Sequence, residues 1–228
     1  MQGKLIVSLG FNLVLVSLCL VGYVGPNVKT TFMPDIEAPI IGAHTRIHPL
    51  AVVIGSVTIG ERVFVAPMAS VRGDEGQHIF IGNDSNVQDG VVIHGLETFE
   101  DDHELPENEV EMEGQKYSVY VGQRVSLAHQ SQVHGPAKVG DDTFVGMQAL
   151  VFRTELGDHV VVEPGAKLIG VKVQPRRYVP ALSIITTQAQ ADALPEITTN
   201  YAYRNLNRGV VGVNVQLAES PQPKPAVK

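Results

Sequence analysis

Aliphatic residues recur through the middle of this chain at intervals of six residues. They are Ile41, Ile47, Val53, Ile59, Val65 and Val71, then Ile81, Val87 and Ile93, then Val121, Leu127, Val133, Val139, Val145 and Val151. No amphipathic α-helix produces this spacing. Because a six-residue unit is too short to bury a core of its own, each aliphatic residue must stack on equivalent residues of neighbouring units. The pattern therefore predicts a solenoid of short repeats.

This pattern resembles the hexapeptide-repeat family, in which three units make one triangular coil of a left-handed parallel β-helix. The resemblance covers residues 35–187 and implies an all-β fold for that part of the chain. We therefore assign residues 35–187 to one β-helix domain, which is the only large domain that a chain of 228 residues requires.

Two gaps interrupt the repeat. Val71 and Ile81 are ten residues apart, four more than one repeat, and Ile93 and Val121 are 28 apart, 22 more than one repeat. We interpret the second gap as a loop, residues 97–118, that leaves the helix. Its acidic residues are Glu97, Glu100, Asp101, Asp102, Glu104, Glu107, Glu109, Glu111 and Glu113. Long insertions of this kind are often functional or disordered, and a solvated surface loop is the alternative interpretation.

The two ends of the chain differ from the repeats. An apolar run from Leu5 to Val24 predicts that residues 1–25 are a signal peptide or a retained membrane anchor, with a buried core helix as the alternative. Either of the first two would export the domain to the periplasm, the cell surface or the medium. Residues 188–219 are expected to be helical, with a break at Pro195, and residues 220–228 to be a disordered tail.

Composition narrows the chemistry. The net charge is −7 and the 17 basic residues are scattered, which argues against a nucleic-acid partner. The single cysteine, Cys19, lies in the N-terminal apolar run, so a metal in the folded part would be held by His, Asp or Glu.

Three histidines are singled out by their place in the repeat. His94 follows Ile93 and His134 follows Val133; they are 40 residues apart, and subtracting the 22-residue insertion leaves 18, or one coil. Their side chains should therefore lie on the same face, one strand spacing apart, and could share one metal ion. His129 falls on the preceding face and could complete the site of a neighbouring subunit. Three histidines with an open fourth position are the arrangement of catalytic zinc.

The other five histidines are expected to be surface or turn residues. They are His44, His48, His78, His103 and His159.

Three stretches extend the resemblance to gamma-class carbonic anhydrases, specifically to exported, trimeric members with an acidic loop. They are A-P-M-A-S-V-R-G-D-E-G (66–76), S-N-V-Q-D-G-V-V-I-H (85–94) and S-L-A-H-Q-S-Q-V-H-G-P (126–136). The match runs from about residue 34 to residue 219. It implies a homotrimer with a C-terminal α-helix packed along each β-helix. It also implies reversible hydration of CO₂ to bicarbonate by hydroxide on a metal between subunits. His94 and His134 of one chain and His129 of the next would bind Zn²⁺, with Fe²⁺ or Co²⁺ as alternatives.

The same resemblance implies roles for four residues near the metal. Glu75 would lie beside the metal-bound solvent, Gln88 would orient that solvent, and Glu97 would be the proton shuttle at the root of the acidic loop. Asn214 matches a pocket residue of the C-terminal helix. We expect Glu75 and Glu97 to carry the proton from the site to bulk water.

Three further residues are implied to support the site. Arg72 and Asp74 would pair across the trimer interface, and Asn86 would line the pocket with Gln88. The alternatives are a purely structural ion pair for Arg72 and Asp74, and a stacked ladder position for Asn86.

The sequence departs from the resemblance at two points, and two rival functions stay open. Gly212 stands where the resemblance leads one to expect an aromatic residue, and the chain has no tryptophan. A non-catalytic assembly subunit of the same family is one alternative function. A hexapeptide acyltransferase that uses a single histidine base is the other, but it explains neither the third histidine nor Glu97.

Overall fold

The structure is a computed structural model that describes residues 23–100 and 103–221. The predicted export segment, with Cys19, lies outside the described residues except for its last three positions. Asp101, Asp102 and residues 222–228 of the predicted tail also lie outside them. Among the residues that are described, no helix is long and apolar enough to cross a membrane.

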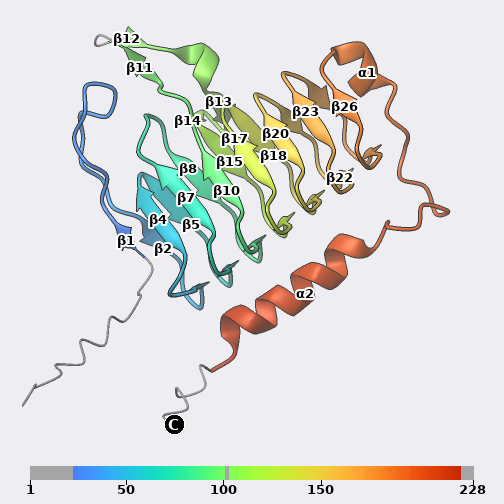
Figure 1. The fold of residues 1–228 in the computed structure, drawn as a ribbon, viewed down its shortest axis with the longest axis horizontal. Helices are drawn as coiled ribbons and strands as arrows, with labels where there is room; N and C mark the ends of the chain where they lie inside the picture. The colour runs from blue at the N-terminus through green and yellow to red at the C-terminus, as the bar shows by residue number, and fades with distance from the viewer. Residues whose placement is uncertain (1–22, 101–102, 222–228) are drawn as a thin grey trace, which may run out of the picture.

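Three parallel sheets form the sides of a solenoid (Figure 1). Sheet A has the order β1 (Val24–Gly25), β4 (Val52–Gly55), β7 (Ser70–Gly73), β10 (Val92–His94), β17 (Gln132–His134), β20 (Leu150–Phe152), β23 (Lys167–Ile169) and β26 (Ile184–Ile185). Sheet B has the order β2 (Ile40–Ile41), β5 (Val57–Ile59), β8 (Ile79–Ile81), β15 (Val119–Val121), β18 (Ala137–Val139), β21 (Glu155–Leu156) and β24 (Lys172–Val173). Sheet C has the order β3 (Arg46–Ile47), β6 (Phe64–Val65), β9 (Asn86–Val87), β16 (Ser126–Leu127), β19 (Phe144–Val145), β22 (Val161–Val162) and β25 (Tyr178–Val179).

The repeat residues of the sequence form the core. In sheet A, Val71, Ile93, Val133 and Val151 are paired strand to strand and are fully buried. Each coil places one such residue from every sheet inside the solenoid, where they pack into one continuous cluster. Stacking on neighbouring coils removes the aliphatic side chains from water, which no single coil could do. The prediction of a parallel β-helix with a C-terminal helix is confirmed.

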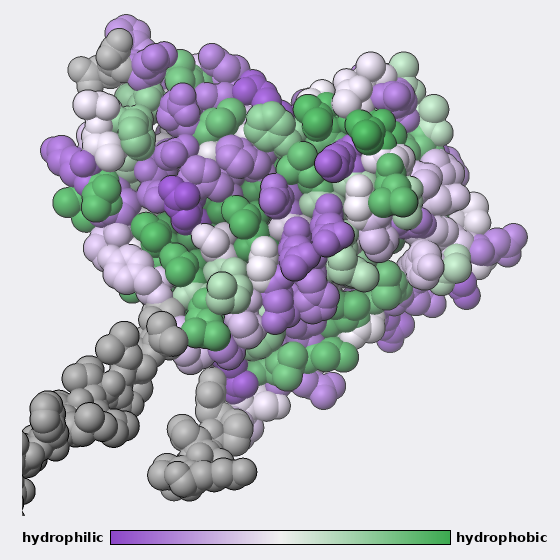
Figure 2. All heavy atoms as spheres, viewed as in Figure 1, coloured by the Kyte–Doolittle hydropathy of each residue, from purple (hydrophilic) through white to green (hydrophobic). Residues whose placement is uncertain are grey.

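The insertion after β10 has secondary structure of its own. It forms two small antiparallel pairs and a short 3-10 helix: β11 (Phe99–Glu100), β12 (His103–Glu104), the 3-10 helix Pro106–Asn108, β13 (Val110–Met112) and β14 (Gln115–Tyr117). Many hydrophilic side chains cover this part of the surface (Figure 2). The described part of the acidic loop therefore has regular structure and projects from the solenoid.

Two helices follow the last coil. Helix α1 (Gln188–Asp192) begins at Thr187, whose side chain and that of Gln190 make a capping box. Helix α2 (Leu206–Glu219) runs along the stack and contacts β3, β6, β9 and β16 of sheet C (Figure 1). Its valines do not prevent a helix. The buried residues of α2 are Asn207, Asn214 and Ala218, and Val210 packs, partly buried, against the cluster of Ala128, Phe144 and Val161.

Candidate functional site

Both insertions of the sequence leave the solenoid at the same corner. The short one follows β7 and the long one follows β10, and these strands are neighbours in sheet A. Arg72 pairs with His94 in the register of the two strands. The insertions touch, since the backbone N–H of Gln77 donates a 2.7 Å hydrogen bond to the buried Thr98 hydroxyl. The segment that follows His94 and the segment that contains Asp74 and Glu75 therefore lie at the same corner of the solenoid.

The structure brings His94 and His134 together as the repeat arithmetic predicted. They are direct partners in the pairing of β10 with β17. Nδ1 of His94 lies 3.4 Å from Nε2 of His134, and the rings meet edge to face. The His94 side chain is 12% exposed, and His134 is partly buried. Adjacent parallel strands therefore hold two imidazoles at a fixed separation.

The hydrogen bonds of the two rings show that the pair fits a metal ion. Nε2 of His94 faces Asp74 Oδ1 at 3.2 Å, and Nδ1 of His134 faces the carbonyl oxygen of Gly135 at 3.3 Å. Both partners are acceptors, so the tautomers that place the ring protons on the outer nitrogens would leave the inner nitrogens with lone pairs for a metal ion. Two nitrogens bound to one tetrahedral Zn²⁺ at about 2.0–2.1 Å would be about 3.3–3.4 Å apart. The inner nitrogens have that separation.

The burial of His94 favours its neutral, metal-binding form. Burial lowers the pKa of His94, because desolvation of the imidazolium outweighs the attraction of the Glu75 and Asp74 carboxylates. Asp74 also accepts a 3.0 Å hydrogen bond from Nε of Arg72 within the same chain. Asp74 therefore links the guanidinium to His94 and fixes the orientation of the imidazole, as outer partners of metal ligands commonly do.

Two carboxylates, those of Glu75 and Glu97, line one cavity beside the histidine pair. Glu75 Oε1 is 3.8 Å from His94 Nε2. The cavity has a volume of about 400 Å³, and its lining residues are Thr31, Phe32, Glu75, Glu97, Phe99 and Glu100. Glu97 is exposed, whereas Glu75 is partly buried. The two predicted proton-transfer residues thus face a common space that opens toward solvent.

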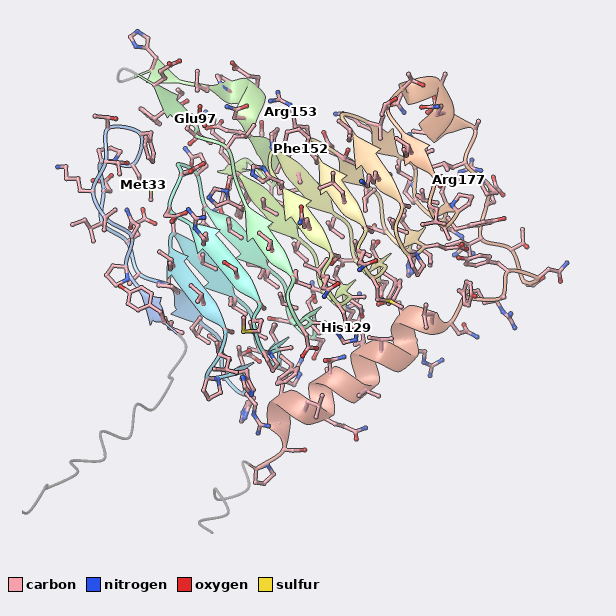
Figure 3. All side chains as sticks on the ribbon, viewed as in Figure 1. Met33, Glu97, His129, Phe152, Arg153 and Arg177 are labelled. Atoms are coloured by element: carbon pink, nitrogen blue, oxygen red, sulfur yellow. The ribbon has the colours of Figure 1, made fainter. Side chains whose placement is uncertain are left out.

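His129 does not join the histidine pair of its own chain. It is in the turn between β16 and β17, is exposed, and faces the Asp89 carboxylate through Nδ1 at 2.9 Å. Figure 3 shows it beside α2, away from Glu97. In residues 23–100 and 103–221, one chain by itself assembles no group of three His, Cys, Asp or Glu side chains that could hold a metal ion.

The remaining predicted residues collect around His129. Gln88, Asp89, His129 and Asn214 line an open groove of about 390 Å³ next to α2. The Gln88 amide donates a 2.9 Å hydrogen bond to Asn86, whose own amide donates to the Ser126 hydroxyl at 2.9 Å. The predicted residues therefore form two groups at different places on one chain: Arg72, Asp74, Glu75, His94, Glu97 and His134 around the first corner, and Asn86, Gln88, His129 and Asn214 beside α2.

Sequence reasoning missed several residues at both places. Thr31 and Phe32 come from the N-terminal segment, which carries no repeat signal. Asp89 could have been found, because it precedes His129 by 40 residues, the same interval that separates His94 from His134. A Cβ atom added at Gly212 on α2 would meet no other atom within 4 Å, so the missing aromatic side chain leaves open space there within one chain.

The chain is similar to known proteins in both sequence and fold. The family model "Bacterial transferase hexapeptide (six repeats)" matches residues 38–73. The chain is 55% identical over 194 residues to the carbonic anhydrase of Methanosarcina thermophila, covering 85% of this chain and 78% of that protein. It is 42% identical over 171 residues to the carboxysome assembly protein CcmM of a Nostoc species, covering 75% of this chain and 29% of that longer protein. The solved UDP-N-acetylglucosamine acyltransferase of Francisella novicida matches with a TM-score of 0.53 at 12% identity, over 64% of this chain and 52% of that one. The last likeness shows the fold alone.

Proposed function

The chain belongs to the gamma-class carbonic anhydrase family, and from that premise we propose that it hydrates CO₂ reversibly to bicarbonate and a proton at a site built around His94 and His134. One observation carries the proposal: Nδ1 of His94 and Nε2 of His134 lie 3.4 Å apart, the separation of two nitrogens on one tetrahedral Zn²⁺. When the ring protons lie on the outer nitrogens, the two inner nitrogens are acceptors that repel unless a cation lies between them. The pair is therefore suited to a metal and poorly suited to acting as a single general base.

His129 of a neighbouring subunit would supply the third nitrogen, in a homotrimer. The observations that support this are its exposure and the fact that, within the described residues, it forms no three-residue metal-binding group with the pair in its own chain. Exposed apolar side chains on the outer face of sheet A also favour contact with another subunit; they are Val92, Ile169 and Ile184. His94 and His134 project from this same face.

The donor set suits Zn²⁺, and Fe²⁺ or Co²⁺ would also accept imidazole nitrogen. When bound, such an ion lowers the pKa of water to about 7, which supplies hydroxide for attack on CO₂ at neutral pH. The chain's own groups would hold and orient the reactants. Gln88, fixed by Asn86, presents an amide in the groove beside His129, where it could orient a small polar molecule.

The proton released in each hydration must leave the site. Glu75 is the first carboxylate next to His94, and it shares a cavity with the exposed Glu97. We assign proton acceptance to Glu75 and delivery to bulk buffer to Glu97. A carboxylate at the solvent boundary can exchange protons with buffer, while a partly buried one stays close to the reacting centre.

The experiment is CO₂ hydration by the anaerobically purified protein, with metal analysis of the same sample. His134→Ala should lose the metal and lower the rate by about 100-fold or more, because ligand removal is more severe than loss of an outer partner. His159→Asn is the matched control: it removes a histidine far from sheet A, and asparagine tolerates the positive φ of that position. A His134→Ala protein that kept both metal and activity would overturn the proposal.

The oligomer can be tested with the same variants. Wild-type protein should sediment as a trimer, and mixing His129→Ala with His134→Ala subunits should restore some intact sites. Subunits that each supply only part of a shared site can complement one another. Full activity in a monomer would refute the shared site. Acetylation of an acceptor by acetyl-coenzyme A, with release of free coenzyme A, would favour the acyltransferase alternative.

A further inference from the structure

The start of the acidic loop is held in place by hydrogen bonds between uncharged groups. Thr98 is fully buried, directly after the exposed Glu97. Its hydroxyl accepts the N–H of Gln77, and its carbonyl accepts the N–H of Leu105 at 2.8 Å. The residue after Glu97 is therefore fixed both to the short insertion and to the far side of its own loop.

A second set of contacts fixes Glu97 itself. The side-chain amide of Asn108 donates a 2.7 Å hydrogen bond to the carbonyl oxygen of Glu97. Asn108 ends the 3-10 helix and is only 8% exposed. Its amide oxygen accepts from Nη1 of Arg153 at 3.3 Å, and Nη2 of the same guanidinium donates to the carbonyl of Glu107 at 3.2 Å.

Arg153 reaches the loop from a different coil. It directly follows β20, two strands away from β10 in sheet A, and Figure 3 shows Arg153, Phe152 and Glu97 on the same side of the molecule. The rigid solenoid thus holds Asn108 through Arg153, and Asn108 in turn holds the backbone at Glu97. We call Asn108 and Arg153 the clasp.

We propose that the clasp positions Glu97 for proton transfer, with Asn108 as the positioning residue and Arg153 as its support. This inference rests on the proposed function. A proton passes between two groups only when they are within hydrogen-bond reach, directly or through one water. A glutamate side chain on a loop has many rotamers, and fixing its backbone keeps the carboxylate within the cavity that Glu75 also lines.

The clasp is separable from the stability of the loop as a whole. The loop has other attachments, because Lys116 pairs with Glu104 at 2.5 Å and with Glu109 at 3.1 Å, and β13 pairs with β14. These attachments do not contact Glu97. Losing the amide donor at position 108 should therefore move Glu97 without unfolding the loop.

The test uses Asn108→Asp in the metal-loaded full-length protein. Aspartate has nearly the same shape and still accepts from Arg153, but it cannot donate to the Glu97 carbonyl. We expect kcat in weak buffer to fall about tenfold while kcat/KM stays unchanged, because only the proton-transfer step is affected. Imidazole added as an external proton acceptor should restore kcat. Arg153→Gln should show the same pattern.

Two comparisons make the result specific. In a Glu97→Ala background, Asn108→Asp should have no further effect, since the group that it positions is gone. Lys116→Met is the matched control: it loosens the loop away from Glu97 and should leave kcat in weak buffer unchanged. Amide exchange of the peptide around Thr98 should be faster in Asn108→Asp, while the exchange of coils far from the loop stays as in the wild type.

The outcomes separate this inference from the proposed function. If the wild type hydrates CO₂ and Glu97→Ala is sensitive to buffer, but Asn108→Asp behaves like the wild type, the clasp has no positioning role. An equal fall of kcat and kcat/KM, or an additional loss in the Glu97→Ala background, would also overturn it. Absence of CO₂ hydration in the wild type would instead refute the proposed function.

Discussion

Substitution of Ile93 tests whether the stacked interior of the solenoid supports the histidine pair. Ile93 is fully buried between Val71 and Val133 of the adjoining coils and directly precedes His94. Ile93→Ala deletes three carbon atoms. At about 0.8 kcal/mol for each buried carbon, the lost transfer free energy is about 2.4 kcal/mol.

The cavity left behind adds to this loss. A residual cavity costs about 24 cal/mol per Å³, and its size depends on how far the walls can collapse. Here the walls are strands held about 4.8 Å apart by parallel ladders on both sides, which limits their movement. We therefore expect the free energy of unfolding to fall by about 3–4 kcal/mol.

The assay is urea unfolding followed by circular dichroism, at one protein concentration and one metal loading, because ligands and subunits both shift apparent stability. Ile40→Ala is the matched control, since it deletes the same atoms from a side chain that is 65% exposed. Its cost should be below about 1 kcal/mol. If Ile93→Ala cost no more than Ile40→Ala, stacking between coils would not be the source of stability.

Three other predictions concern single contacts. Gly76→Ala should lower the free energy of unfolding by about 1–3 kcal/mol in urea, because Gly76 has a φ of +98° and a Cβ there would collide with the Thr98 hydroxyl; an unchanged midpoint would contradict this. Burial lowers the pKa of His78 below its ordinary value of 6.5, so the stability from this group is present above that pH and is lost as pH falls through the folded-state pKa. His78→Gln should flatten that part of a stability curve, and equal slopes would count against the assignment. Thr187→Ala should weaken the start of α1 by about 0.5–2 kcal/mol through loss of the capping box with Gln190, measured as faster amide exchange in that helix, and unaltered exchange would show that the cap contributes little.

The histidine pair could be predicted from sequence because the repeat is periodic and rigid. Counting residues places His94 and His134 one coil apart once the insertion is removed, and strand pairing fixes the rest. The helix around Asn214 could also be predicted, although it begins only at Leu206, eleven residues after the expected break at Pro195. Residues 200–205 form turns instead, and they lie in the segment that connects the last coil to the helix on sheet C.

Contacts between irregular segments could not be predicted in this way. Nothing in the spacing indicates that Asp74 faces His94, that Phe32 lines the cavity with Glu75, or that Arg153 reaches Asn108. These pairs lie between 20 and 45 residues apart, and at least one partner of each lies outside the repeat. A periodic pattern fixes only the residues that share the period, so side chains on loops must be seen in the structure.

Variation in coil length is confined to one corner of the solenoid, and this explains where the site arose. From sheet B to C and from C to A, successive core residues are always six apart, as in Ile59, Val65 and Val71. From sheet A to sheet B, the number of residues between successive core positions varies. It is six after Val53 and Val133 and five after Val151 and Leu168, but ten after Val71 and 28 after Ile93.

The corner between sheets B and C has a constant length because each coil places a residue with positive φ there. From the second coil on, the N–H of that residue donates a hydrogen bond to the preceding coil. Asp84, for example, donates to the Glu61 carbonyl at 3.0 Å, and an added residue would break that ladder. The corner from A to B has no such uniform turn, so it tolerates insertions. His94 ends a strand at that corner, and Glu75 and Glu97 enter on the insertions beside it. Rigid strands thus hold the groups that must keep a fixed separation, while the carboxylates that exchange protons with solvent lie on segments whose length the fold leaves free.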